Sequence, residues 1–333
     1  MKLIRKPVAF ATWLAFYVPS TMFVLLVMGK EYLRLRKSKA GGNGTAVNGR
    51  SDRDTMVRFV ERNVRIAPRD MDEGIGTVYE RILIDEFLRR LQTNHGITAV
   101  LESPADGVTG VPGVMSLQFA RNGASVTLTN PVPAMLDCAR EAWERVDLIE
   151  HLRLVPCEVD ATPFDDNSFD LVWNYCMFER FANPNPLVAE MKRVSRRYVM
   201  LMTQNFYNFG TPFHKVYHAM SGMEWDHGYG SQMTMAAIRR AVLEQGLQIE
   251  EEGEIDIPPW LDTWDMPLRG ALKQMLAAVG KKWEWKIDSE DNSAEAGQPS
   301  SSKMISFFRG VELTLPQWFR RYQAHHLYIL ARK

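Results

Sequence analysis

Cysteine is scarce in this chain of 333 residues. Cys138, Cys157 and Cys176 are the only three, and their spacing forms neither a CxxC pair nor a zinc-binding pattern. The scarcity excludes a disulfide framework and a cysteine-based metal centre. We therefore expect reduced, semi-buried thiols in a domain that faces the cytosol.

A surplus of either charge is absent as well. The chain has 40 Lys and Arg residues against 40 Asp and Glu residues. Proteins that bind nucleic acids usually carry a basic field, so we expect no nucleic-acid partner. We also find no internal repeat.

Charged side chains are missing from one long stretch, Val8 to Met28. As a helix this stretch would measure about 30 Å, the thickness of a bilayer core, and lipid-embedded helices tolerate a proline such as Pro19. A cleaved signal peptide is the alternative, but no small-residue cleavage site follows Val27 and Met28. We predict a transmembrane anchor within residues 1–37. The larger number of basic residues after it predicts a single-pass membrane protein with its domain in the cytoplasm.

The remaining chain is expected to form a linker and one large domain. Residues 38–53 are rich in Gly, Asn and Ser and predict a flexible tether. Residues 54–333 predict a single domain with an insertion, or lid, at about 258–316. The run from Asp288 to Lys303 is polar and is expected to be a mobile loop.

An apolar run followed by a glycine-containing loop organises this domain. Ile97 to Leu101 predict a strand that ends on Glu102, and a loop, a helix over 114–121 and a second strand ending on Asn130 follow. Further strands are expected at 152–159, 169–174, 198–203, from 248 onward and at 326–330. We predict a doubly wound, mostly parallel α/β sheet of seven strands, with its ligand at the carboxyl ends of the strands.

These motifs resemble the cofactor half of class I S-adenosylmethionine (SAM)-dependent methyltransferases, type 11-like, over roughly 77–253 and a last strand at 325–332. The segment from Asp160 to Asn174 carries the most specific part of the resemblance. Asn130 stands where the family has an acidic residue, and Pro104 stands in its glycine loop. The resemblance implies a Rossmann-like methyltransferase fold with SAM as cofactor. It implies these cofactor-binding residues: Glu102, Ser103, Gly107, Asn130, Asp160, Ala161 and Asn174.

Histidines after the fifth strand are the candidates for acid–base catalysis. His227, between Asp226 and Gly228, is the preferred base, and His214 is the second candidate. A loop histidine that caps backbone groups is an equally good interpretation. His214 and His218 lie one helical turn apart, but no third ligand accompanies them, so we expect no metal.

The acceptor is inferred from the tryptophans of the insertion and from the predicted anchor. Both favour methyl transfer to a membrane-associated, lipid-like or isoprenoid molecule. The main alternative is a catalytically inactive methyltransferase-like binding or scaffold protein. A dinucleotide oxidoreductase is disfavoured because Glu102 ends the first strand where a Gly-x-Gly-x-x-Gly motif would begin. The sequence does not indicate an oligomeric state.

Overall fold

The computed structural model describes residues 75–105, 111–221, 225, 227–258 and 299–333, together with 8, 10–15, 17–19, 21–22 and 25–26 near the N-terminus. The predicted linker at 38–53, the helix expected over 55–64, Gly107 and most of the predicted insertion lie outside the described residues.

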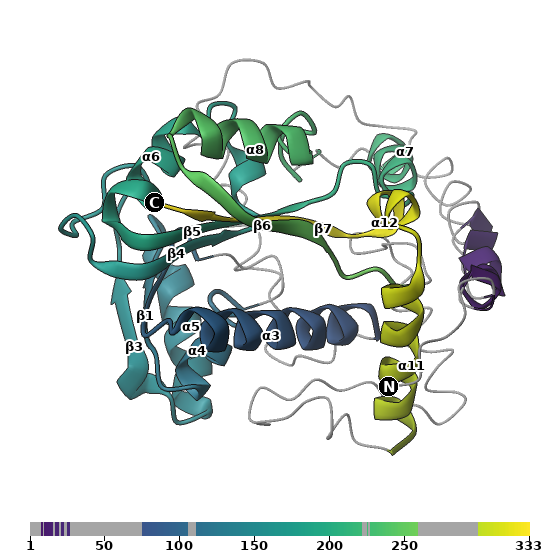
Figure 1. The fold of residues 1–333 in the computed structure, drawn as a ribbon, viewed down its shortest axis with the longest axis horizontal. Helices are drawn as coiled ribbons and strands as arrows, with labels where there is room; N and C mark the ends of the chain where they lie inside the picture. Colours follow the sequence, from purple (N-terminus) through teal and green to yellow (C-terminus); the bar gives the residue numbers. More distant parts are fainter. Residues whose placement is uncertain are drawn as a thin grey trace.

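A seven-stranded sheet forms the centre of the molecule (Figure 1). Its strands follow the spatial order β3-β2-β1-β4-β5-β7-β6. Neighbouring strands from β3 to β5 are parallel, whereas β7 is antiparallel to both β5 and β6. The strand bounds are β1 Ala99–Glu102, β2 Ser125–Thr129, β3 Leu152–Val155, β4 Phe169–Tyr175, β5 Ser195–Gln204, β6 Gln248–Ile255 and β7 His326–Arg332.

Helices cover both faces of the sheet, as a doubly wound fold requires. On one face lie α3 (Ile75–His95), α4 (Leu117–Arg121) and α5 (Pro133–Arg145), and on the other lie α6 (Asn185–Val194) and α8 (Met235–Glu244) (Figure 1). Three further helices gather at the edge where the parallel strands end, on the right of Figure 1: α7 (Thr211–Ser221), α11 (Pro299–Thr314) and α12 (Gln317–Gln323). Two single turns, Ile149–His151 and Phe178–Arg180, complete the described helices.

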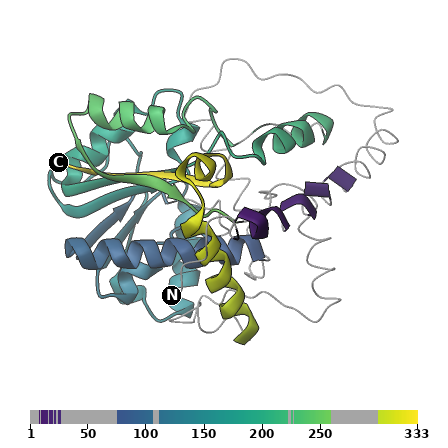
Figure 2. The same cartoon turned by 45° about the vertical axis from the view of Figure 1, so that its right-hand side comes forward.

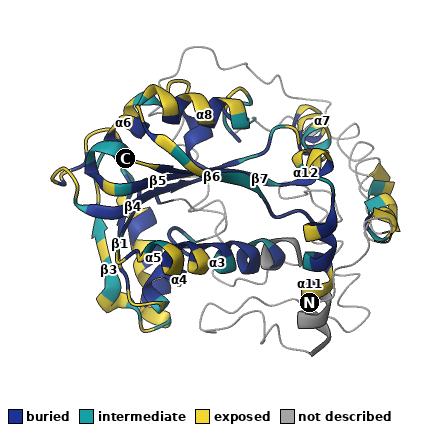
Figure 3. Ribbon diagram, viewed as in Figure 1, coloured by how far each residue is buried: buried dark blue, intermediate teal, exposed yellow. Residues whose placement is uncertain are grey.

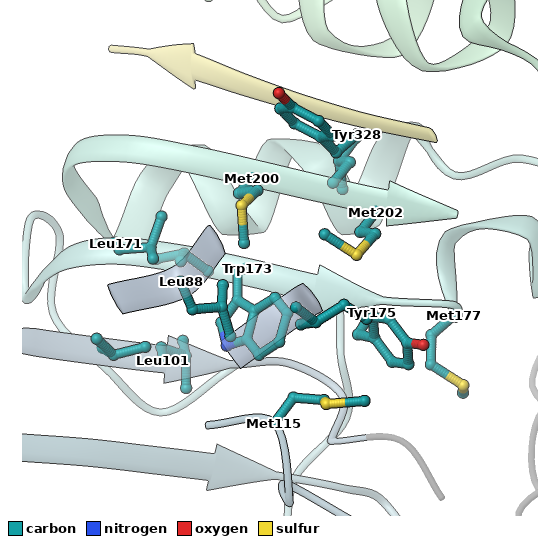
Figure 4. Close-up of a cluster of buried hydrophobic side chains, with 14 of the residues drawn as sticks. Leu88, Leu101, Met115, Leu171, Trp173, Tyr175, Met177, Met200, Met202 and Tyr328 are labelled. Carbon is teal, nitrogen blue, oxygen red and sulfur yellow. The ribbon is translucent and has the colours of Figure 1, made fainter. Parts of the chain in front are cut away.

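The core lies around β4 and β5, whose residues are buried on both faces (Figure 3). Continuous apolar runs such as Tyr198 to Met202 suit a strand with helices on either side. Trp173 and Tyr175 of β4 are in register with Met200 and Met202 of β5, and the four side chains lie together in the close-up (Figure 4). Methionine fills the spaces between the flat aromatic rings because its side chain is unbranched and adaptable.

The predicted α/β fold is therefore confirmed, with a mixed sheet. Two predicted boundaries were wrong. The helix expected at 185–197 ends at Val194, because Ser195 to Arg197 already belong to β5. The mobile run expected to reach Lys303 gives way at Pro299 to α11, whose Ile305 and Phe308 are buried in the main core.

The structure gives no support to the predicted transmembrane anchor. Among the described residues, none of the helices combines the length and the apolar character that crossing a bilayer demands. The N-terminal helical residues instead contact α12 (Figure 2). Trp13 is only 4 % exposed, and its ring lies 4.5 Å from that of Phe319, edge to face. This segment therefore packs against α12 rather than against the strands of the sheet.

Candidate functional site

The predicted cofactor residues meet at the carboxyl ends of β1, β2 and β4. Glu102 closes β1, Asn130 follows β2, and Asn174 is the penultimate residue of β4. In the sheet order, the chain leaves β1 toward β2 on one side and later returns to β4 on the other. This reversal is the topological switch point at which open α/β sheets bind their ligands.

Ser103 ties the three strand ends together. Its backbone N–H donates to the carbonyl of Trp173 at 3.0 Å, and its hydroxyl oxygen accepts from Thr129 at 2.8 Å. Its carbonyl accepts from the amide of Asn174 at 2.9 Å, while the oxygen of that amide accepts from the N–H of Phe178 at 2.8 Å. The first residue of the loop is thus fixed by all three strands.

Glu102 places a carboxylate at the end of β1. The side chain is 2 % exposed, and the hydroxyl of Ser116 donates to its Oε2 at 2.5 Å. The indole N–H of Trp173 donates in turn to the Ser116 oxygen at 3.0 Å. This chain of donors orients the carboxylate inside the protein.

Asn130 is fully buried and serves the loop backbone. Its amide nitrogen donates to the carbonyl of Ala105 at 2.8 Å, and its amide oxygen accepts from the N–H of Val132 at 2.8 Å. An acidic residue at this place would lack the donor that Ala105 uses. The local backbone therefore accounts for an amide here.

Asp160 and Ala161 are exposed in the loop after β3. The next residue fixes this loop, because the N–H and the hydroxyl of Thr162 both donate to Glu190 Oε1, at 2.7 and 2.6 Å. Burial of Glu190 acts to raise its pKa, but the hydrogen bonds from Arg193 and Thr162 outweigh burial and hold that pKa below its usual value. The loop that carries Asp160 is therefore clamped to α6.

The charges of these residues suit a cationic, sugar-bearing cofactor. Their hydrogen-bonding groups suit it only in part. Glu102 supplies negative charge at the switch point, and the exposed Asp160 can accept from an amine such as that of adenine. Asn130 would have to exchange its partners before it could bond a ribose. The predicted roles of Glu102, Ser103, Asn130, Asp160, Ala161 and Asn174 stay predictions, as does that of Gly107.

A second site lies at the end of β5. A cavity of about 30 Å³ is bordered by residues from β5, α7, the loop before α8 and the start of β7. Its lining includes Gln204, Asn205, Thr211, His214, His227 and His325. A cavity of that size holds about two water molecules, so it admits one polar end of a molecule.

Three buried histidines and the half-buried Trp225 form a cluster at this cavity. The ring of His227 lies 5.6 Å from that of His214, 5.3 Å from that of His218 and 4.6 Å from that of Trp225. His214 and His218 occupy successive turns of α7, as their spacing predicted. Within the described part of the chain, no group of three or more His, Cys, Asp or Glu residues is arranged to hold a metal ion.

Gly228 explains why His227 reaches the cavity. Its φ of +101° lies in the left-handed region, and a Cβ at this position would collide with the backbone carbonyl of Glu179. The same carbonyl accepts from the N–H of Tyr229 at 2.7 Å. Only glycine lets the loop lie this close to the turn after β4.

His325 and Asp256 are site residues that the sequence analysis missed. His325 borders the cavity, and its Nδ1 lies 2.7 Å from Oδ2 of Asp256. Asp256 directly follows β6 and His325 directly precedes β7, and these strands pair antiparallel through Ile255 and His326. An acid just after one strand and a histidine just before its antiparallel partner were the available signal.

Tyr79 and Glu80, at the start of α3, are held by a buried polar network next to this pair. The hydroxyl of Tyr79 donates to Glu312 Oε2 at 2.9 Å. The hydroxyl of Tyr175 donates to Glu80, and it lies 3.3 Å from Nε2 of His326. The interpretation that Tyr79 and Glu80 merely pack or are solvated is incomplete, because both make specific polar contacts.

Comparisons with known proteins agree with this arrangement. Residues 108–202 match the methyltransferase domain family. No curated protein matches the sequence. Among solved structures, a SAM-dependent methyltransferase from Aquifex aeolicus is 13 % identical with a TM-score of 0.41, over 59 % of this chain and 92 % of that one.

Two further solved structures show the same level of likeness. A geranyl diphosphate methyltransferase in complex with GPP and sinefungin is 13 % identical with a TM-score of 0.41, over 74 % of this chain and 77 % of that one. The cyclase SpnF is 15 % identical with a TM-score of 0.47, over 88 % and 99 %. Likenesses this weak carry no argument about the acceptor.

The family match covers β2, β3, β4 and most of β5, and of these β4 borders the switch point, where β1 ends on Glu102. On these grounds the chain carries a methyltransferase domain, it is a SAM-dependent methyltransferase, and its cofactor is S-adenosylmethionine.

Proposed function

We propose that this methyltransferase acts on a membrane-associated, lipid-like or isoprenoid acceptor whose polar end enters the cavity at the end of β5. The observation that supports the proposal is a set of exposed aromatic side chains beside that cavity, which we call the rim aromatics: Tyr207, Phe209, Trp318 and Tyr322.

The rim aromatics belong to two elements that meet at the cavity. Tyr207 and Phe209 flank Asn208, one of the cavity residues, and Trp318 and Tyr322 lie on α12. The rings of Phe209 and Tyr322 stack at 5.9 Å, and Trp318 is 64 % exposed. Large exposed rings beside a site mark a surface for apolar ligands or for the membrane interface.

In this proposal the cofactor occupies the switch point and the acceptor approaches from the side of β5. When bound, S-adenosylmethionine supplies an electrophilic methyl group on a sulfonium. Glu102 faces its cationic end and Asp160 accepts from its adenine amine, as the resemblance implies. His214 and His227 contact the polar end of the acceptor from the cavity wall. The residues hold both reactants in one geometry, which is the main requirement of an in-line displacement.

Cofactor binding is tested by calorimetry with Asp160→Ala. If Asp160 holds the adenine amine, its loss weakens SAM affinity by about 1–3 kcal/mol. Asp165→Ala is the matched control, because Asp165 is exposed in the same loop. Equal affinity of the two variants, both folded, would remove Asp160 from the site.

The acceptor is tested with phosphatidylcholine vesicles that contain farnesol, an isoprenoid alcohol. We expect the full chain to transfer labelled methyl groups to farnesol, with a product heavier by one methylene. The double variant Trp318→Ser, Tyr322→Ser should bind SAM normally and raise the farnesol concentration needed for half-maximal turnover. A chain that binds SAM and leaves both farnesol and a membrane lipid extract unmethylated would contradict the proposed acceptor class.

A further inference from the structure

The Asp256–His325 pair has the geometry of an oriented imidazole. The Nδ1 of His325 donates to Oδ2 of Asp256 at 2.7 Å, and the backbone N–H of His325 donates to the carbonyl of Asp256 at 2.9 Å. Two contacts to one residue fix both the backbone and the ring. With Nδ1 held by a carboxylate, the imidazole exchanges protons with an occupant of the cavity through Nε2.

The pair lies at the same edge of the sheet as the switch point. His325 precedes β7, which is the second neighbour of β4 in the sheet and begins beside the end of β5. With strands spaced by about 5 Å, the cavity lies on the order of 10 Å from the switch point between β1 and β4. A hydroxyl in the cavity therefore reacts only with a cofactor whose methyl end extends from the switch point toward β5.

Other polar residues of the cavity wall already have structural tasks. The amide nitrogen of Asn205 donates to the carbonyls of Arg321 and Ala324, at 2.7 and 2.9 Å. The amide nitrogen of Asn208 donates to the carbonyls of Gln323 and Ala324, at 2.8 and 3.1 Å. Both asparagines fasten the loop after β5 to the end of α12, so the imidazoles are the groups suited to proton transfer.

We propose that His325 is the general base of the methyl transfer, that Asp256 is its positioning residue, and that the reacting group of the acceptor is a hydroxyl. The inference rests on the proposed function and adds to it the class of the nucleophile. His214 and His227, the candidates drawn from the sequence, then line the same cavity as His325 without taking the proton.

The proposed step balances without any further reactant. A lone pair of the hydroxyl oxygen forms the new bond to the methyl carbon, and the bond between that carbon and sulfur breaks toward sulfur. The hydroxyl proton passes to Nε2 of His325, and the carboxylate of Asp256 stabilises the resulting imidazolium. The imidazolium later releases the proton to water.

The surroundings of the pair favour this role. Burial raises the pKa of Asp256, although the neighbouring His325 acts to lower it. A carboxylate with a raised pKa attracts the Nδ1 proton more strongly and makes Nε2 more basic. The titratable and charged groups around the pair are Tyr79 and Glu80 on α3, His326 on β7, Glu312 on α11 with Arg320 of α12 beside it, and His214 and His227, which line the same cavity as His325.

The first experiment compares turnover of farnesol in phosphatidylcholine vesicles by the full chain and four variants: His325→Gln, His151→Gln, Asp256→Asn and His227→Gln. His325→Gln should lower turnover by about 100-fold or more, the usual contribution of a general base. His151→Gln is the control, because His151 lies at the far edge of the sheet, before β3, and should match the parent. SAM affinity, measured by calorimetry, should be the same in all of them.

Asp256→Asn provides the readout that a purely structural role would not change. Turnover requires a neutral imidazole, so it falls as pH drops through the pKa of His325. Without the neighbouring carboxylate the imidazolium is less stable, and this acid limb should move to lower pH by about one unit. Nitrogen NMR of the histidine rings should show the Nδ1–H tautomer of His325 in the parent. In Asp256→Asn, the pH at which the His325 ring titrates should be lower by the same one unit.

The outcomes separate the inference from the proposed function. If calorimetry detects no binding of SAM, the proposed function itself is contradicted. SAM binding with farnesol turnover that His325→Gln leaves unchanged overturns the inference alone, and so does an acid limb that Asp256→Asn does not move. Loss of turnover in His227→Gln with full turnover in His325→Gln assigns the base to His227. SAM binding without any methylation of farnesol overturns the hydroxyl acceptor together with this inference.

Discussion

Glu312 is a carboxyl group whose ionisation depends on its burial. Burial is the largest cause that raises its pKa to about 7, and the hydrogen bond from Tyr79 acts in the opposite direction. The folded chain therefore holds a proton on Glu312 between its ordinary pKa of 4.5 and about 7, whereas the unfolded chain has released it. The stability this proton provides is complete below pH 4.5 and is lost as pH rises through 7.

We predict that Glu312→Gln removes this pH dependence. The amide oxygen still accepts from Tyr79, so stability near pH 5 should stay close to that of the parent. At pH 8 the variant should be more stable, by about 3 kcal/mol at most. Urea unfolding at both pH values measures the effect, with Glu250→Gln on the exposed face of β6 as control. A variant that is no more stable than the parent at pH 8 would contradict the assignment.

Asn130 gives a second prediction at this scale. Asn130→Asp replaces the donor to the Ala105 carbonyl with a carboxylate oxygen, and two acceptors then face each other in a buried place. We expect a loss of about 1–3 kcal/mol in unfolding free energy at pH 7. Asn183→Asp is the control, because Asn183 is exposed and its Oδ1, which accepts from the N–H of Asn185, is kept by aspartate. Equal stability of the two variants would refute the backbone role of Asn130.

The residue roles differ in how well the sequence predicts them. Glu102 and Asn130 were located because a buried strand precedes each, so their place at the switch point follows from local pattern. Asp256 and His325 are 69 positions apart, and they meet only because β6 and β7 pair in one register. An acid after one strand and a histidine before another are only a weak local signal, because nothing in the sequence states which strands pair, so the sequence analysis did not single out this pair.

At the scale of elements, the N-terminal segment is tied to α12 by Trp13. This side chain stacks on Tyr17 at 4.2 Å and belongs to a small cluster that also contains Ile257, Val311, Leu315 and Phe319. We predict that Trp13→Ala loosens α12, at a cost on the order of 3 kcal/mol for this cluster. Hydrogen exchange of the amides of residues 317–323 should become faster.

Met22→Ala is the control for this change, because Met22 lies in the same segment and is 61 % exposed. In Met22→Ala, the amides of α12 should exchange at the same rate as in the parent. Identical exchange in Trp13→Ala would mean that α12 does not depend on the N-terminal segment.

The elements themselves were largely predictable. The strands from Ile97 to Leu101 and from Tyr198 to Thr203 were visible as apolar runs, and α8 begins after Thr234, whose side chain accepts from the N–H of Ala237. The N-terminal segment is ambiguous in the sequence because an uncharged stretch is typical both of a bilayer span and of a helix with one face packed on protein. Hydrophobicity alone does not distinguish these two environments.

At the scale of the whole molecule, the predicted lid gives the last test. Residues 288–298 lie outside the described residues, and the sequence predicts a mobile polar run there, which ends where α11 begins at Pro299. If this run works as a lid, a Gly/Ser linker in place of 288–298 should leave SAM affinity unchanged and lower turnover of farnesol. The exchange stops before α11 because Ile305 and Phe308 belong to the core.

Replacing 288–298 with the linker can give three results, each with a different meaning. Normal SAM affinity with reduced turnover supports a lid. Normal values of both assign the segment no role in the reaction. Loss of both, with a lower melting temperature, indicates a role in folding.

The position of β7 has a consequence for how the chain is made. The last strand of the sequence inserts between β5 and β6, and β6 pairs with β7. A ribosome delivers β6 long before β7, so β6 waits without its partner while residues 256–325 are still being translated. Its four glutamates, at positions 250, 251, 252 and 254, give the waiting strand a negative charge that discourages pairing with other nascent chains. The sheet is completed only after residues 326–332 have left the ribosome, so a chain truncated before His326 leaves one edge of β5 and one edge of β6 unpaired.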